Sequence, residues 1–308
     1  MRVLSNQAAG MLLGLLGVTI FGGTLPMTRL ALEGFGPLFI TLARAVIAAA
    51  AAGTALWLLR RPFPRAHLPT LAGVGLCAVF GFPIFSSIAL QTIPASHGGV
   101  VLGILPLLTA VFAAIVDGER PGPLFWLCGV AGAALVIAFS LRESGFHLGA
   151  GDFWLLLAAM SASLSYVFSA KLARVMPGWE VIGWAVVICL PGTLVGTILA
   201  AGSGIHAPGP MQYGALLYLG LMSMFGGFIF WNAGLALGGI ARVAQVQLFQ
   251  TFVTLAISAL VLRETVGPET LGFALAVAFV VWLGRKAKIG RAAPAPEVPG
   301  PSASIRHR

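Results

Sequence analysis

Charged residues are scarce in this chain: Asp, Glu, Lys and Arg make up 9% of its 308 residues, and only 9 residues are acidic. A soluble globular domain carries about 25% charged residues, because its surface must be solvated. The charges present are too few to cover a water-facing shell, which excludes most classes of soluble enzyme. Hydrophobic residues instead make up 58% of the chain, and its mean hydropathy is +0.98. The sequence therefore predicts an integral membrane protein.

Cysteine pairs and catalytic signatures are also lacking. Cys77, Cys128 and Cys189 lie singly in apolar stretches, without a CxxC motif or a nearby His. Disulfide frameworks and metal sites need paired spacings, so we interpret the three cysteines as packing residues and expect neither metal nor cofactor. The G-x-S-x-G motif does not occur and the five His are scattered, which disfavours an intramembrane enzyme, the alternative from a different functional class.

Apolar runs dominate what is present. A spanning helix needs about 20 mostly apolar residues, and ten windows meet this length. They are roughly 8–31, 36–59, 69–92, 96–116, 122–141, 150–171, 179–201, 213–235, 240–262 and 268–286. None alternates as a strand of a membrane β-barrel does, so the predicted fold class is an all-α membrane protein with ten transmembrane helices. The first run is too long for a signal peptide and is interpreted as an uncleaved span.

The distribution of Lys and Arg predicts the orientation. With the N-terminus inside, fourteen basic residues lie on the cytoplasmic side and three, Arg29, Arg142 and Arg263, lie outside. This positive-inside bias places both termini in the cytoplasm. The net charge of +9 is thus a topology signal, and we expect no nucleic-acid partner. The Pro/Ala-rich tail, residues 289–308, is predicted to be disordered.

The sequence repeats itself at an offset of 145 positions. A Phe-Gly-x-x-Ile-Phe run starts at Phe80 and again at Phe225, and a Glu-x-x-Gly-Pro run starts at Glu119 and again at Glu264. Each half then holds five spans, and since five is odd, the second half enters the membrane from the opposite side. The predicted domains are a first five-helix repeat (1–145), a second, inverted repeat (146–288) and the tail (289–308). Inverted repeats are typical of secondary transporters that work by alternating access.

Interrupted spans at matching positions indicate where such a transporter binds its substrate. Gly and Pro residues interrupt the first, third, fourth and eighth predicted spans. Close helix packing through small residues is the alternative explanation for any one glycine. The candidate hinge or gate residues are Gly23, Pro26, Gly81, Pro83, Gly98, Gly226 and Gly227.

Three stretches carry a family resemblance: FGGTLPMTRLAL, GPLFITLARAVIAAA and ILPLLTAVFAAIVDGERPGP. They resemble the repeated unit of the drug/metabolite transporter superfamily, EamA type, in which one Arg marks the second span, here Arg44. The unit also has a proline in its fourth span, here Pro106. The second half resembles the unit more loosely, with Thr251 in place of that proline. The resemblance covers about residues 8–286 and implies a ten-span carrier of a bacterial inner membrane. Within the superfamily it is nearest to the amino acid exporter branch, which includes aromatic amino acid and paraquat exporters.

Polar residues within the spans are candidates for lining a central cavity. Each has an alternative role in hydrogen bonding between helices, and His97 is equally well explained as an interfacial or gate residue whose charge makes transport pH-sensitive. The candidate substrate-binding residues are Thr24, Ser86, Gln91, His97, Ser165, Tyr166, Trp231, Asn232 and Gln245.

Ionisable residues inside the membrane are costly and usually functional. No Asp or Glu lies at mid-span, which argues against a proton relay and for a facilitative carrier. Arg44 lies within the second span, either as a structural residue that snorkels or pairs with a carbonyl, which we favour, or as a ligand for a substrate carboxylate. Sugar phosphates are disfavoured because they need several deep cations.

The sequence as a whole predicts a secondary transporter that exports small metabolites, with neutral or aromatic amino acids as the leading substrate class. Efflux of lipophilic cations or drugs, or transport of another metabolite, remains the alternative. The expected partners are the small-molecule substrate and the lipid bilayer, and we expect a monomer.

Overall fold

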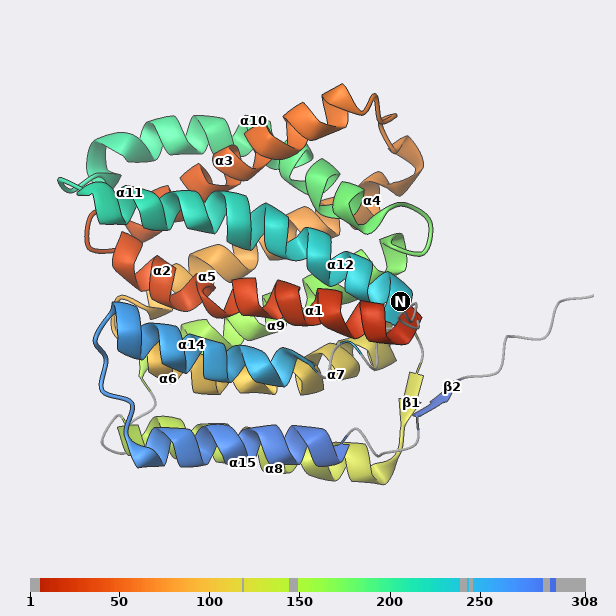
Figure 1. Cartoon of the computed structure of the whole chain (residues 1–308), viewed down its shortest axis with the longest axis vertical. Coiled ribbons are helices and arrows are strands. Elements are labelled where there is room, and N and C mark those ends of the chain that lie inside the picture. The colour runs from red at the N-terminus through yellow and green to blue at the C-terminus, as the bar shows by residue number, and fades with distance from the viewer. Residues whose placement is uncertain are drawn as a thin grey trace, which may run out of the picture.

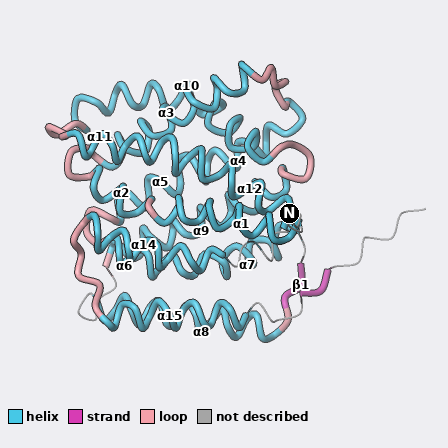
Figure 2. The backbone as a smooth tube through the Cα atoms, in the orientation of Figure 1, coloured by secondary structure: helices cyan, strands magenta, loops and turns pink. Residues whose placement is uncertain are grey.

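The computed structural model describes residues 6–117, 119–143, 149–238, 243, 246–284 and 289–291. Figure 1 shows long helices lying nearly parallel to a common axis, with the connections gathered at the two ends of the bundle. Helices account for almost all of the described chain (Figure 2), as the apolar composition predicts, because a helix satisfies its own backbone hydrogen bonds.

Several of the long helices are continuous runs of shorter segments that differ in helical type. The segments η1 and η3 are 3-10 helices, and η2 and η4 are π-helices. In chain order the segments are α1 (Asn6–Gly22), α2 (Thr24–Ala31), α3 (Pro37–Leu58), η1 (Arg65–His67), α4 (Leu68–Val74), η2 (Gly75–Gly81), α5 (Phe82–Ala89), α6 (Ala95–Val101), η3 (Leu102–Ile104), α7 (Leu105–Asp117), α8 (Pro123–Glu143), α9 (Ala150–Leu172), α10 (Gly178–Gly204), α11 (Pro210–Leu217), η4 (Tyr218–Gly226), α12 (Gly227–Gly238), α14 (Gln247–Val261) and α15 (Pro268–Gly284).

Seven of these runs are long and apolar enough to cross a membrane, judged by length and composition. They are Ala8–Ala31, Pro37–Leu58, Arg65–Ala89, Ala95–Val116, Ala150–Leu172, Gly178–Gly204 and Pro210–Leu237. Three further apolar helices, Trp126–Phe139, Gln247–Val261 and Pro268–Gly284, are shorter. They fall in the predicted fifth, ninth and tenth spans, so the count of ten remains a prediction. The ninth is short partly because most of residues 239–245 lie outside the described chain.

One short strand pair accompanies the helices. Strand β1 (Glu119–Pro121) pairs antiparallel with strand β2 (Ile289–Arg291), with Arg120 opposite Gly290. Strand β2 belongs to the tail that the sequence predicts to be disordered, and its backbone partner is the loop that precedes α8. The rest of the tail lies outside the described residues.

Helix packing follows a regular scheme between the first half of the chain, up to residue 145, and the second. Among the pairs that pack across the halves are α1 with α12, α5 with α9, α3 with α10, α6 with α14 and α8 with α15. Numbered by the predicted spans, these pairs are one with eight, three with six, two with seven, four with nine and five with ten. If each span is replaced by the span at the same place in the other half, the same set of pairs results.

Small residues allow the closest of these contacts. A Cβ added to Gly234 in α12 would lie 2.7 Å from the backbone nitrogen of Gly14 in α1, and one added to Gly17 would lie 3.0 Å from the backbone nitrogen of Trp231. These glycines bring the two backbones together, as small residues do where helices pack without a hydrophobic driving force.

The two π-helices occupy matching positions in the two halves. Segment η2 ends at Gly81 and η4 ends at Gly226, which are the residues paired by the sequence repeat. A π-helix is rare, occurs mostly as a short insertion in an α-helix, and is frequent at functional sites. Both lie in the middle of the runs Arg65–Ala89 and Pro210–Leu237.

The helices α8 and α15 form a pair at one edge of the bundle (Figure 1). At one end of the pair, the Arg142 guanidinium donates two hydrogen bonds to the Glu269 carboxylate, at 2.8 and 2.7 Å. At the other end, β1 leads into α8 and β2 follows α15. The pair is therefore connected at both ends.

Candidate functional site

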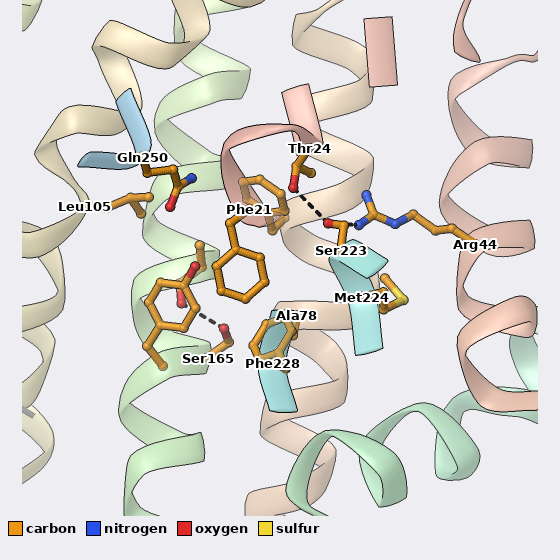
Figure 3. A pocket seen from close by; sticks show the side chains of 13 residues that line it. Phe21, Thr24, Arg44, Ala78, Leu105, Ser165, Ser223, Met224, Phe228 and Gln250 are labelled. Atoms are coloured by element: carbon orange, nitrogen blue, oxygen red, sulfur yellow. Dashed lines mark hydrogen bonds between the residues drawn. The ribbon is translucent and has the colours of Figure 1, made fainter. Parts of the chain in front are cut away.

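A buried pocket lies in the middle of the bundle, between the two halves of the chain. Figure 3 shows side chains from α1, α2, α3 and η2 facing side chains from α9, η4, α12 and α14. Its lining residues are Phe21, Thr24, Arg44, Ala78, Phe82 and Leu105 from the first half, and Ala162, Ser165, Tyr166, Ser223, Met224, Phe228 and Gln250 from the second.

The break in the first span is built into the wall of this pocket. Helix α1 ends at Gly22 and α2 starts at Thr24, and at this break the Gly23 N–H donates to the carbonyl of Ile20, three residues back, at 3.2 Å. The Tyr218 hydroxyl donates to the Ile20 carbonyl at 2.7 Å, and the Thr254 hydroxyl donates to the Gly22 carbonyl at 2.8 Å. Side chains of the second half thus satisfy the interrupted helix of the first, as a broken helix in a membrane requires.

Three polar side chains form a connected row along one side of the pocket. The Arg44 guanidinium donates through Nη2 to the Ser223 hydroxyl at 2.9 Å, and the Ser223 and Thr24 hydroxyls lie 2.8 Å apart. These residues come from α3, η4 and α2 (Figure 3). The row therefore joins the second, eighth and first spans at one point.

Arg44 is 2% exposed. Its Nε and Nη1 atoms have no hydrogen-bond partner among the described residues, and no ion pair of this side chain occurs there. A buried charge that is neither paired nor fully hydrogen-bonded is costly. The pocket therefore presents an uncompensated positive charge and spare N–H donors.

Aromatic rings form the opposite wall. Phe21 meets Phe228 edge to face, with ring centroids 5.0 Å apart, and Tyr166 lies 5.6 Å from Trp231. The rings come from α1, α9 and α12, so this wall also joins both halves. Such a surface suits an apolar or aromatic group of a ligand.

The space inside the pocket is small. About 30 Å³ is open to the centre of a sphere the size of a water molecule. A single water needs roughly 10–15 Å³ on this measure, so the space corresponds to two or three water molecules. An amino acid is larger, and its binding requires the surrounding helices to move apart.

The predicted site residues divide between this pocket and other places. Thr24, Ser165 and Tyr166 line the pocket. Trp231 is 1% exposed and packs behind the aromatic wall against Tyr166. Asn232 does not line the pocket, because its amide nitrogen donates to the Gly178 carbonyl at 2.9 Å and joins α12 to the start of α10.

Two more predicted residues lie outside the pocket, and one cannot be placed. Ser86 is buried and donates to the Pro83 carbonyl of its own helix at 3.2 Å. Gln91 is exposed, because α5 ends at Ala89, before the predicted end of the third span. Gln245 lies outside the described residues.

His97 belongs to a second, separate pocket at the start of α6. Its Nε2 lies 2.7 Å from Oδ1 of Asp152, the first-turn acid of α9, and its ring packs against Phe139 with centroids 4.8 Å apart. Next to it, the Glu264 carboxylate accepts the backbone N–H groups of Ala95 and Ser96, at 2.9 and 2.8 Å. His97 thus lies at a contact between the halves and not in the central pocket.

The candidate hinge residues coincide with helix interruptions or close contacts. Gly23 separates α1 from α2, and Gly81 and Gly226 end the two π-helices. Pro83 follows η2 at the start of α5, and Pro26 lies in α2. Helix contacts account for the other two: a Cβ on Gly98 would lie 2.9 Å from Leu25, and one on Gly227 would lie 2.6 Å from Phe21.

Ser223 is not among the site residues that the sequence predicts, and for Arg44 the sequence favours a structural role over binding of a carboxylate. One signal in the sequence points to Arg44, since it is the only Asp, Glu, Lys or Arg deep in a predicted span. Ser223 carries no such signal, because its role comes from meeting Arg44 across the two halves. Within the described residues, no cluster of three or more His, Cys, Asp or Glu side chains is placed to hold a metal ion.

Comparison with known proteins gives the family. The EamA-like transporter family model matches residues 8–141 and, a second time, residues 149–284. The chain is 40% identical over 284 residues to the uncharacterized transporter YdeK of Bacillus subtilis, covering 92% of this chain and 99% of that protein. It is 28% identical over 283 residues to a probable terminal-alkyne amino-acid exporter of Streptantibioticus cattleyicolor, covering 88% and 92%.

Two further similarities are partial or distant. Over 104 residues, 33% of either protein, the chain is 34% identical to the aromatic amino acid exporter YddG of Ancylobacter novellus. A solved crystal structure at 20% identity, covering 90% of this chain and 96% of that one, has a TM-score of 0.61, which shows a shared fold. The predicted EamA-type resemblance is confirmed, and this multi-pass membrane protein belongs to the EamA-like transporter family.

Proposed function

We propose that the chain is a secondary transporter that exports neutral amino acids, aromatic ones in particular, or closely related metabolites. The observation that carries this proposal is the central pocket, which is lined by both halves, closed to anything larger than a few waters, and walled by aromatic rings. A substrate site shared between two halves can face each side of the membrane in turn when the halves rock.

The proposed architecture is ten spans arranged as two inverted five-helix repeats. Three observations support it: the family model matches each half separately, the π-helices end at repeat-related glycines, and the helix pairs persist when the halves are exchanged. The Lys and Arg distribution supports cytoplasmic termini. We further propose a monomer in a bacterial inner membrane.

The substrate class rests on chemistry and on relatives. The rings of Phe21, Tyr166 and Phe228 offer an apolar surface for a side chain, while Arg44, Ser165 and Gln250 offer polar groups for a small head group. Two of the similar proteins carry names of amino acid exporters. None of the described lining residues is acidic, and this supports facilitated exchange over obligatory proton coupling.

Counterflow in proteoliposomes tests the proposal. Vesicles loaded with unlabelled substrate are placed in trace amounts of labelled phenylalanine, tryptophan, leucine, a sugar phosphate or a lipophilic cation, with and without a pH gradient. We expect transient accumulation of the aromatic amino acids that does not depend on the gradient. Accumulation of sugar phosphate or cation alone would refute the substrate class, and strict dependence on the pH gradient would refute the facilitative mechanism.

A further inference from the structure

We infer that Arg44 binds the carboxylate of the transported substrate and makes a carboxylate group the main requirement for recognition. This inference rests on the proposed function, because it assigns part of the same pocket. It follows from how few of the donors of Arg44 are used and from the absence of any acidic partner in the described lining.

A guanidinium has five N–H donors arranged in a planar fork. In this structure one of them, on Nη2, is used by Ser223, whereas Nε and Nη1 have no partner. The guanidinium has two edges that each offer a pair of N–H donors, one from Nε and Nη2 and the other from Nη1 and Nη2. The bond to Ser223 uses one Nη2 hydrogen and therefore only one edge, so both donors of the other edge remain free. A carboxylate accepts two parallel N–H bonds from such an edge, so the geometry suits it.

Neighbouring hydroxyl groups hold the Arg44 guanidinium in place. The Ser223 hydroxyl that receives the Nη2 bond also lies 2.8 Å from the Thr24 hydroxyl. These contacts fix the guanidinium from two spans besides its own, α2 and η4 (Figure 3). A positioned donor loses little conformational freedom when the ligand binds, which favours affinity.

The charge of the lining selects the class of ligand. Among the described lining residues Arg44 is the one ionised side chain, so this lining carries a positive charge without a negative one. The unpartnered Oε1 of Gln250 is a neutral acceptor for an ammonium group and attracts it far less than a carboxylate would. We therefore expect the substrate's carboxylate to contribute more to binding than its ammonium group. A phosphate, with its higher charge, would call for further cations.

Three compounds with the same aromatic ring separate these contributions: phenylalanine, phenethylamine, which lacks the carboxylate, and 3-phenylpropionate, which lacks the ammonium group. Each is tested as a competitor of labelled phenylalanine counterflow and, on the purified protein in detergent, as a ligand in a thermal-shift assay. We expect phenylalanine and phenylpropionate to compete within roughly tenfold of each other, and phenethylamine to be about 10- to 100-fold weaker.

Variants assign the effect to Arg44. Arg44→Gln is expected to weaken phenylalanine binding about 10- to 100-fold and to abolish the preference for the acid over the amine. Arg44→Lys retains the charge without the fork and is expected to be intermediate. Arg29→Gln is the matched control, because Arg29 lies in the neighbouring helix α2 and donates to the Leu90 carbonyl outside the pocket. It should leave the preference unchanged.

Different results separate this inference from the proposed function. If no amino acid gives counterflow and none shifts the melting temperature, the proposed substrate class itself is wrong. If phenylalanine is transported but phenethylamine competes equally well, the role of Arg44 is refuted, and this test needs only the unmodified protein. An Arg44→Gln variant that folds and keeps the preference for the acid refutes it as well.

Discussion

Replacing Glu264 by Ala is expected to lower the melting temperature of the purified carrier in detergent by about 6–12 °C. Glu264 lies between α14 and α15, in the second half of the chain, and its two carboxylate oxygens accept the N–H groups of Ala95 and Ser96 at the start of α6. The first backbone N–H groups of a helix have no partner within it. The substitution thus removes a cap that one half provides for the other.

The magnitude follows from those two bonds. A hydrogen bond to a charged group contributes about 1.5–3 kcal/mol, and the negative charge also interacts favourably with the helix dipole. Because the site is partly exposed, we take the lower end of the range and expect a loss of about 3 kcal/mol. For a chain of this size, each kcal/mol corresponds to about 2–4 °C. Glu264→Gln keeps one neutral acceptor and should lose about half as much.

Glu269→Ala is the matched control. It removes the same side chain five residues further on, where Glu269 forms an ion pair with Arg142 and both side chains are more than 60% exposed. Exposed pairs contribute about 0–1 kcal/mol, so the melting temperature should fall by no more than about 4 °C. Equal losses for Glu264→Ala and Glu269→Ala, measured by a thiol-independent unfolding assay, would refute the capping role.

Two further predictions address the pocket and the topology. Ala162→Leu places a larger side chain in the small central space and is expected to abolish counterflow. Met160→Leu, on an exposed face of the same helix, should leave counterflow unchanged. A fully active Ala162→Leu variant would show that the substrate passes elsewhere. In a cysteine-free background, Gln91→Cys should react with a membrane-impermeant maleimide added to whole cells or spheroplasts. Arg61→Cys should react only after the membrane is opened. The reverse pattern would contradict the cytoplasmic termini.

The sequence was sufficient for the coarse arrangement because hydropathy and repetition are strong signals over long stretches. Seven runs of membrane-spanning length lie where apolar windows predicted spans, and the π-helices end at the glycines paired by the repeat. The small strand pair was not predictable, because β2 lies in a Pro/Ala-rich tail and its partner β1 is far away in the chain.

The direction in which each side chain faces was much harder to predict. In a membrane helix the lipid-facing and protein-facing sides are both apolar, so the sequence pattern does not reveal which face lines a cavity. A π-helix adds a residue to a turn and rotates everything after it. Ser86 and Gln91, both predicted to line the pocket, follow η2 and lie elsewhere.

Contacts between the halves determine where the other polar side chains lie. Asn232 is polar and mid-chain, yet it bonds to a carbonyl at the start of α10. Ser223 became a site residue only because Arg44 reaches it from another helix. Pairings of this kind depend on how spans far apart in the sequence are placed relative to one another. No local pattern in the sequence encodes that placement.

The pair of α8 and α15 places a constraint on how the proposed carrier can move. The first helix ends one half and the second ends the other, and neither contributes to the described lining of the central pocket. The two helices pack against each other, β1 pairs with β2 at one end, and Arg142 bonds to Glu269 at the other, so we expect the pair to move together. If the halves rock as proposed, we expect the pivot to lie at this edge of the bundle. The widest opening should occur at the opposite side, so distance probes placed on α3 and α10 would report the largest changes.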